Sequence, residues 1–228
     1  MSKKHLKHAK ENIPLFSMNE VEDSVDFIAE KQKSKIPKIK GLVLAGGKSR
    51  RMGQDKGLIN YHGTPQRDYA ANILSPFCKE VYISCRPDQL EQIKSPYPLL
   101  ADSFLDLGPL GAILSAFRFD PESAWLVVAC DLPLLEPQSI EQLIAERNYS
   151  KTATAFLNPE LGFPEPLITL WEPKSYPITL QFLAQGYSSL RKVLINSDVE
   201  VIEAQNQEWL KNVNSPEDKE ELLKRLHT

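Results

Sequence analysis

Short apolar stretches recur along most of this chain, at a spacing that leaves room for helices between them. Four such stretches predict strands, at residues 41–45, 80–84, 125–130 and 152–156. They lack the clean apolar–polar alternation of a half-exposed sheet, which indicates strands covered on both faces. The pattern therefore favours buried, mainly parallel strands over a sheet with one face in water.

The segments between these strands carry helix-start signals. Thr64-Pro65, Pro109 and Pro137 predict helices that run to about Phe77, Phe117 and Glu146, because proline fits the first turn and a threonine hydroxyl can cap it. Three further helices are predicted at residues 175–185, 189–195 and 216–226, the last capped by Ser215. This alternation predicts an α/β fold whose mainly parallel sheet binds ligands at the carboxyl ends of its strands.

The composition of the chain changes at about residue 38. The first 40 residues hold nine Lys and six acidic side chains, whereas the remaining residues carry a net negative charge. We interpret residues 1–38 as an N-terminal extension and linker with a short amphipathic helix, and residues 39–228 as one folded domain. The extension could instead be the tail of an upstream domain or an arm that packs on a partner.

Charge and residue usage exclude several kinds of protein. With 27 Lys and Arg against 30 Asp and Glu, the net charge of −3 offers no basic field, so neither nucleic acid nor a membrane is expected as a partner. The longest apolar run, residues 124–130, is far shorter than the roughly 20 residues that span a bilayer. The N-terminus shows no secretory signal, so we expect a cytoplasmic protein. Cys78, Cys85 and Cys130 match no disulfide framework or zinc motif and are expected to be free thiols.

The glycine-rich segment LAGGKSRRMGQDKG, residues 44–57, follows the first predicted strand directly. Its glycines let backbone amides approach a polyphosphate, and Lys48, Arg50, Arg51 and Lys56 supply four cations within nine residues. The pattern is neither a Walker A loop nor GxGxxG. It predicts a nucleoside triphosphate site of another kind; the competing interpretation is a tight turn with solvated cations.

Two further places carry candidate chemistry. Asp131 comes directly after a seven-residue apolar run, where its carboxylate could hold Mg²⁺ together with phosphate oxygens, or could cap the turn at Pro133. Asn212 and Asn214 precede the last predicted helix. Side chains at i and i+2 of an extended segment face the same side, which suits hydrogen bonding of both amides to one ligand. Asn214 could instead serve as a cap or turn residue.

Several of these segments resemble one family of enzymes. Residues 44–56 are similar to the signature LAGGxSxRMGxDK of nucleotidyltransferases, most closely the MobA-type molybdenum cofactor guanylyltransferases. HGTP (62–65), ADSFLDLGPLGAI (101–113), VVACDLPLL (127–135), EPLITLW (165–171) and NVNSPED (212–218) follow in the order that family leads one to expect. The resemblance covers residues 39–226 and implies a Rossmann-like three-layer nucleotidyltransferase fold.

The resemblance also implies roles for individual residues. Nucleotide binding falls to Leu44, Ala45, Gly46, Gly47, Lys56, Ser84, Asp102, Gly108 and Asp131. Asp131 is the expected Mg²⁺ ligand and acts in catalysis with Arg51 and Lys56, which supply positive charge to the phosphates. Asp106 could take the place of Asp102, and Asn212 and Asn214 are expected to receive the acceptor. Pro164 to Pro166 resemble a loop that precedes a strand, without a catalytic role.

The implied reaction transfers GMP from GTP to molybdenum-loaded molybdopterin and releases pyrophosphate, with Mg²⁺ as the cofactor. It allows transient contact with other cofactor-biosynthesis proteins or molybdoenzymes. Relatives usually place a guanine-contacting asparagine after the second strand, but here the sequence reads ISCRPDQ, with Ser84, Cys85 and Arg86 in that region. Cytidylyl transfer to the same cofactor therefore stays open. So do nucleotidyl transfer to a different phosphate, such as a sugar 1-phosphate, and a non-catalytic nucleotide-binding module.

Overall fold

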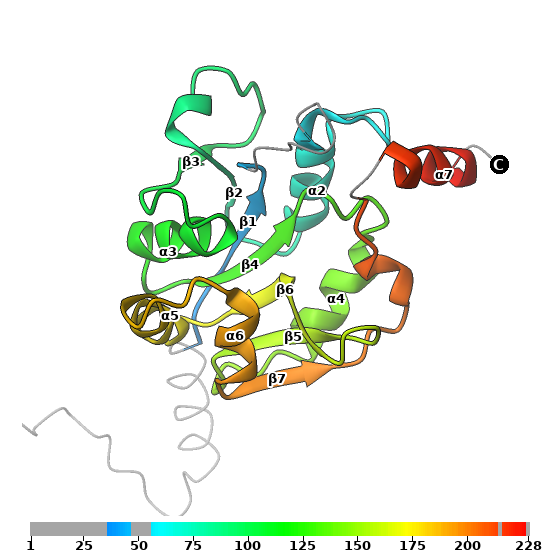
Figure 1. Ribbon diagram of the computed structural model, residues 1–228. Helices are drawn as coiled ribbons and strands as arrows, with labels where there is room; N and C mark the ends of the chain where they lie inside the picture. The colour runs from blue at the N-terminus through cyan, green and yellow to red at the C-terminus, as the bar shows by residue number, and fades with distance from the viewer. Residues whose placement is uncertain (1–35, 47–55, 214–215, 227–228) are drawn as a thin grey trace, which may run out of the picture. The chain divides into compact units, whose positions relative to one another are not determined.

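A seven-stranded sheet forms the centre of the fold in the computed structural model, which describes residues 36–46, 56–213 and 216–226 (Figure 1). The strands are β1 (Ile39–Leu44), β2 (Val81–Cys85), β3 (Leu99–Ala101), β4 (Ala124–Ala129), β5 (Ala153–Asn158), β6 (Phe163–Trp171) and β7 (Val199–Ile202). The helices are α2 (Gln66–Leu74), α3 (Pro109–Phe119), α4 (Pro137–Ala145), α5 (Ser175–Ala184), α6 (Leu190–Ile195) and α7 (Pro216–Leu226). Short 3₁₀ turns lie at η2 (Lys56–Leu58), η3 (Pro87–Gln89) and η4 (Gln207–Leu210).

The strand order is β3-β2-β1-β4-β6-β5-β7. Strands β1 to β4 pair in parallel with one another, and β5 pairs in parallel with β7, whereas β6 runs antiparallel to both β4 and β5. Strands β2 and β3 lie on one side of β1, and the chain then crosses back so that β4 lies on the other side of β1. Such a reversal of strand order is the point at which open α/β sheets bind ligands.

Helices cover both faces of the sheet and bury it in two cores. One core joins α2 and α4 to the sheet through residues such as Leu74, Leu126 and Leu143. The other joins α3 and α6 to the opposite face and includes Phe117 and the paired Trp125 and Trp171. All six residues of β4 are buried, which explains why its sequence is apolar without alternation.

The α/β fold predicted from the sequence is confirmed, with differences in detail. The sequence pattern does not predict strands β3, β6 and β7; only the family resemblance implies a strand after residues 164–166. Pro164 to Pro166 lie within β6 and not in a loop before it. Helix α2 begins at Gln66 with Pro65 as its N-cap and no side-chain cap, so the predicted Thr64 cap is wrong, and it ends at Leu74. The predicted Ser215 cap lies outside the described residues.

The boundary at residue 38 stays a prediction, although β1 begins at Ile39. Cys78, Cys85 and Cys130 form no disulfide, as expected. In the part of the chain that the structure describes, no helix is long and apolar enough to cross a membrane.

Candidate functional site

The site begins where β1 ends between its two parallel neighbours. Leu44, the last residue of β1, pairs with Ser84 of β2 and Ala129 of β4. Two backbone hydrogen bonds extend these ladders: the Ala45 amide donates to Ser84 at 3.2 Å, and the Cys130 amide donates to Leu44 at 3.2 Å. The start of the glycine-rich segment therefore lies between the loops that follow β2 and β4.

Asp131 lies just beyond the end of β4 and pairs with Lys56. The Lys56 ammonium lies 3.2 Å from Asp131 Oδ2, and about a fifth of each side chain is exposed. Asp131 Oδ1 is buried and accepts no hydrogen bond from a described residue. A buried carboxylate oxygen without a donor is costly unless a cation or another donor meets it.

This donor set fits Mg²⁺ bound together with a nucleotide. Among the described residues, no three His, Cys, Asp or Glu side chains cluster as a complete metal site. Magnesium does not need one, because it commonly binds through one or two carboxylates and the phosphates of its substrate. Asp131 could supply that carboxylate.

The loop after Asp131 is held in place from α2 and the segment before it. Three side chains donate to its carbonyl oxygens: His62 to Pro133 at 2.7 Å, Gln66 to Leu132 at 3.4 Å, and Tyr69 to Leu135 at 3.3 Å. The His62 ring also stacks on Tyr69, with 3.9 Å between ring centroids. These contacts fix the loop and leave the Asp131 carboxylate available for the site.

Asp102 lies directly after β3, with its carboxyl group beside β2. Ser84 donates its hydroxyl to Asp102 Oδ1 at 2.8 Å, and the Asp102 amide donates to the Cys85 carbonyl at 2.8 Å. Burial raises the pKa of Asp102 to about 6, against the opposing effects of the Ser84 hydrogen bond and the Arg86 charge. A carboxyl group with a perturbed pKa at the edge of such a sheet is a candidate ligand-binding group.

The loop from Asp102 to α3 is shaped by glycine and serine. Gly108 has φ +57°, which favours glycine, and Pro109 then starts α3. A Cβ on Gly111 would lie 2.2 Å from the Phe104 carbonyl oxygen, so only glycine fits there. The buried Ser115 hydroxyl accepts from the Ser103 amide at 2.8 Å and donates to the Gly111 carbonyl at 2.6 Å. The loop is thus packed tightly on the first turns of α3.

The segment before α7 is joined to Asp131 through the backbone. The Val213 amide donates to the Asp131 carbonyl at 3.0 Å, and Val213 is buried in a small cluster with Ile59 and Tyr61. Burial and, to a smaller extent, the charge of the Asp131 carboxylate raise the pKa of Tyr61 to about 12. Asn212, the residue before Val213, is exposed at this edge.

Comparison with known proteins agrees with this fold. Residues 41–201 match the MobA-like NTP transferase domain. The chain belongs to this family. It is accordingly a nucleotidyltransferase of the MobA-like type.

Individual relatives cover most of this MobA-like chain. It is 38% identical to the molybdenum cofactor biosynthesis bifunctional protein of Synechocystis sp. over 78% of this chain, but spans only 52% of that longer relative. It is 33% identical to the molybdenum cofactor guanylyltransferase of Pseudomonas putida, over 80% of this chain and 96% of the relative. The crystal structure of molybdopterin-guanine dinucleotide biosynthesis protein A from Archaeoglobus fulgidus superposes with a TM-score of 0.66 at 23% identity, covering 82% of this chain and 96% of that one.

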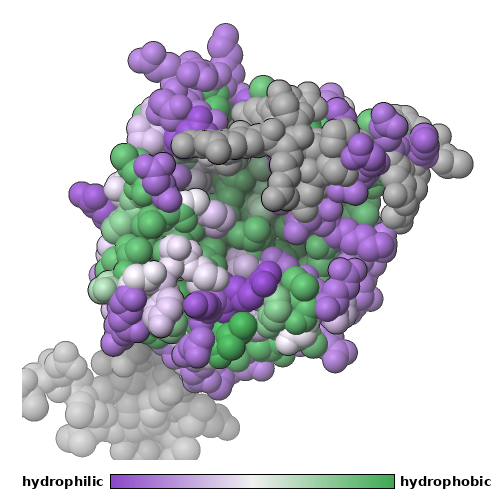
Figure 2. Space-filling model, in the orientation of Figure 1, coloured by the Kyte–Doolittle hydropathy of each residue, from purple (hydrophilic) through white to green (hydrophobic). Residues whose placement is uncertain are grey.

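The structure brings most of the predicted site residues of the MobA-like chain to one edge of the sheet. These are Leu44, Ala45, Gly46, Lys56, Ser84, Asp102, Asp131 and Asn212. Gly108 lies at the start of α3, and its contact with a nucleotide stays a prediction. Gly47, Arg51 and Asn214 lie outside the described residues. On the face shown in Figure 2, hydrophobic residues form the recessed middle and hydrophilic residues border it.

Sequence reasoning missed the residues that support the site. The sequence marks His62 only as part of a motif and Arg86 only as a neighbour of the base-contacting region, and it does not mark Ser115 at all. His62 and Arg86 make their site contacts to residues 71 and 40 positions away. The only local signal is the HGTP motif, which points to the segment without indicating what its histidine holds.

Proposed function

We propose that this protein transfers GMP from GTP to the terminal phosphate of molybdenum-loaded molybdopterin, with release of pyrophosphate. The observation that carries the proposal is the Lys56–Asp131 pair, 3.2 Å apart at the point where strand order reverses. An ammonium beside a carboxylate suits a triphosphate that binds with a divalent cation. Relatives named molybdenum cofactor guanylyltransferase, 31% and 33% identical, support guanine and this acceptor.

In the proposed reaction, a phosphate oxygen of the acceptor attacks the α-phosphorus of GTP in line. A new P–O bond forms to the acceptor phosphate while the bond to the bridging oxygen of the β-phosphate breaks, and pyrophosphate leaves with that electron pair. Asp131 would hold Mg²⁺, which when bound neutralises charge on the phosphates. Lys56 would turn its ammonium toward the same phosphates, and Arg51 would stabilise the charge on the leaving group.

The nucleotide would lie across the ends of β1 and β2. Backbone groups from Leu44 to Gly47 would face the phosphates, in the manner of other glycine-rich anion sites. Ser84 and the Asp102 carboxyl, joined by a 2.8 Å hydrogen bond, lie on the β2 side and would contact the nucleoside, with Gly108 beside them. An accepting carboxylate there suits the N–H groups on the edge of a guanine base.

The acceptor would enter on the β4 side, next to the segment that precedes α7. Asn212 and Asn214 would hydrogen-bond the pterin or its phosphate. The 3.0 Å hydrogen bond from Val213 to Asp131 supports this assignment, because it ties the acceptor segment to the residue that would hold the metal. This connection would keep the attacking phosphate oxygen aligned with the α-phosphorus of the nucleotide.

The second candidate base is cytosine. The end of β2 carries the buried Cys85 in the region where the guanine-contacting asparagine is expected, and burial raises the pKa of this thiol to about 11. A neutral thiol is a weak hydrogen-bond donor and acceptor and would discriminate poorly between bases. Ser84 and Asp102 are then the groups left to read the base.

Pyrophosphate release tests the proposal. Purified protein is mixed with Mg²⁺ and molybdenum-loaded molybdopterin, and GTP, CTP, ATP and UTP are compared in parallel, with EDTA as the metal control. Release with GTP alone is the expected result. Release with CTP alone would replace guanylyl by cytidylyl transfer, and no release with any nucleotide would overturn the proposal.

A further inference from the structure

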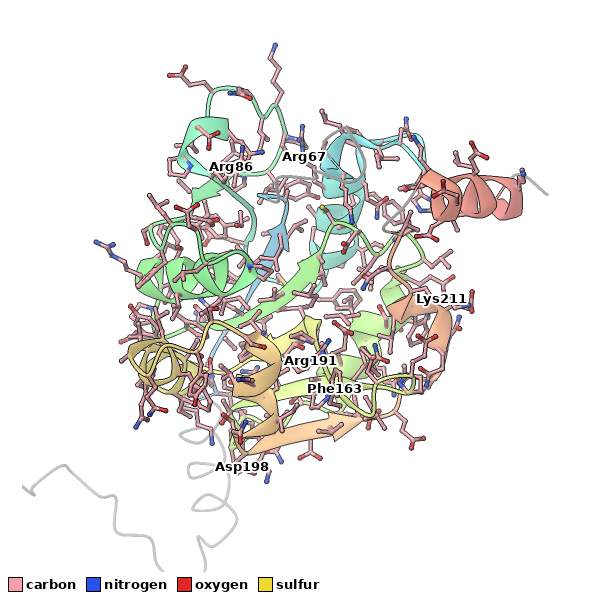
Figure 3. The ribbon with its side chains drawn as sticks, viewed as in Figure 1. Arg67, Arg86, Phe163, Arg191, Asp198 and Lys211 are labelled. Carbon is pink, nitrogen blue, oxygen red and sulfur yellow. The ribbon has the colours of Figure 1, made fainter. Side chains whose placement is uncertain are left out.

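Arg86 follows β2 directly, and its side chain connects two loops of the site. Its Nη1 donates to the Gly46 carbonyl at 2.8 Å, across 40 positions of sequence. Its other two nitrogens pair with one carboxylate: Nε and Nη2 each lie 3.0 Å from an oxygen of Asp88. All three guanidinium nitrogens therefore have a partner, and the group is held in one orientation. Figure 3 shows Arg86 on the loop beyond β2.

The backbone of Arg86 is held as firmly as its side chain. The Arg86 amide donates to Gln89 Oε1 at 3.0 Å, and the Gln89 amide returns to the Arg86 carbonyl at 2.9 Å. Gln89 is buried at the end of η3. Gly46 packs directly on this region, because a Cβ placed on Gly46 would lie 3.4 Å from the backbone nitrogen of Arg86 and 3.5 Å from Cys85 Cα. The Arg86 side chain therefore reaches Gly46 from a backbone that is itself held by hydrogen bonds.

We propose that Arg86 is a positioning residue for the triphosphate, acting through the Gly46 peptide group. The Ala45 amide is held by the Ser84 carbonyl and the Gly46 carbonyl by Arg86, and the peptide group that carries the Gly46 N–H lies between these two held groups. Holding the Gly46 carbonyl therefore limits how far the Gly46 N–H can turn away from a bound phosphate. Arg86 does not touch the reacting atoms in this proposal. The inference rests on the proposed function, since it requires the glycine-rich segment to bind a nucleoside triphosphate.

A competing explanation is that Arg86 acts only as a positive charge that attracts phosphates through space. Asp88 separates the two explanations, because it braces the guanidinium and also cancels part of its charge. If Arg86 positions the loop, Asp88→Asn weakens the contact that orients the Arg86 guanidinium and so weakens nucleotide binding. If Arg86 acts by charge alone, the same substitution removes a negative neighbour and strengthens binding. The two explanations predict opposite signs.

The experiment measures KM and kcat for the nucleotide by pyrophosphate release in wild type, Arg86→Ala, Arg86→Lys and Asp88→Asn. Arg118→Ala, an exposed arginine near the end of α3, is the matched control. We expect Arg86→Ala to raise KM about 10-fold, the scale of losing one charge-assisted hydrogen bond, with kcat changed less than about 2-fold. Arg86→Lys should fall between, and Asp88→Asn should raise KM about 3-fold.

An unchanged KM in Arg86→Ala, or a lower KM in Asp88→Asn, would overturn the inference. If Arg86→Ala does not fold, Arg86→Lys and Asp88→Asn decide the outcome. Amide hydrogen exchange at Ala45 and Gly46 adds a readout that needs no activity. Faster exchange in the Arg86 variants with an unchanged melting temperature supports the positioning contact even if wild type releases no pyrophosphate, which would be a failure of the proposed function alone. Unchanged exchange would overturn the contact itself.

Discussion

Replacing Asp102 by asparagine tests whether the candidate site is built at a cost to stability. Burial raises the pKa of this carboxyl from 3.8 to about 6, so the folded protein holds the ionised form less readily than the unfolded chain does. Asparagine has the same shape and its oxygen can still accept from Ser84. The substitution therefore removes the charge and keeps the 2.8 Å hydrogen bond.

The sign and size of the effect follow from the two pKa values. Well below pH 3.8 the carboxyl is protonated in both states, and its burial carries no charge penalty. As pH rises from 3.8 to about 6, the unfolded chain ionises first and the folded state loses relative stability. The full shift corresponds to about 3 kcal/mol, which we reduce to about 1 kcal/mol because the carboxyl is only half-buried and water screens it.

Thermal melting of wild type and Asp102→Asn at pH 4 and pH 8 measures this difference. At pH 8 the variant should melt roughly 2–4 °C higher, the shift expected for about 1 kcal/mol in a domain of this size, and at pH 4 the two should nearly coincide. Glu141→Gln, an exposed carboxyl on α4, controls for the loss of one negative charge. A difference that is the same at both pH values would refute the reasoning.

Two further predictions concern the site and its support, and a third concerns a buried ion pair at the opposite end of the sheet. Asp131→Ala should abolish turnover while the melting temperature stays within about 2 °C, because the side chain lies at the strand edge and its Oδ1 has no described donor to lose; near-normal Mg²⁺-dependent turnover would contradict its assignment. Gly111→Ala should lower the free energy of unfolding, measured in urea, by about 1–3 kcal/mol, because the alanine Cβ would lie 2.2 Å from the Phe104 carbonyl oxygen. Glu172→Gln should cost about 3–5 kcal/mol in the same assay, because it breaks the buried pair with Arg147, at 2.7 and 2.9 Å, and a cost below about 1 kcal/mol would count against that pairing.

The sequence predicted those parts of the fold whose cause is local. Strand β4 is buried along its whole length and is followed by a charged residue, so both the strand and the edge position of Asp131 could be read from neighbouring residues. The start of α3 at Pro109 and the turn at Gly108 are equally local. The direction of β6 could not be read in this way, because an antiparallel strand covered on both faces is as continuously apolar as a parallel one.

The supporting contacts of the site could not be predicted because they join distant parts of the chain. The hydrogen bonds from His62 to Pro133 and from Arg86 to Gly46 exist only after the parallel strands bring their loops together. Nothing in the residues around Arg86 distinguishes it from a solvated surface cation. The partner is decided by the order of the strands, which places the loop after β2 beside the loop after β1.

The use of His62 also bears on how the proposed reaction avoids acid–base catalysis. His62 is the only histidine among the described residues, and it holds the loop of Asp131 through a 2.7 Å hydrogen bond and a stacked contact with Tyr69. An acceptor phosphate is already anionic near neutral pH, so it can attack without a base to remove a proton. The work left for the protein is to align two phosphates and to offset their repulsion. Lys56, Asp131 and the braced Gly46 peptide are suited to those two tasks, which is why a site without a catalytic histidine is sufficient for this chemistry.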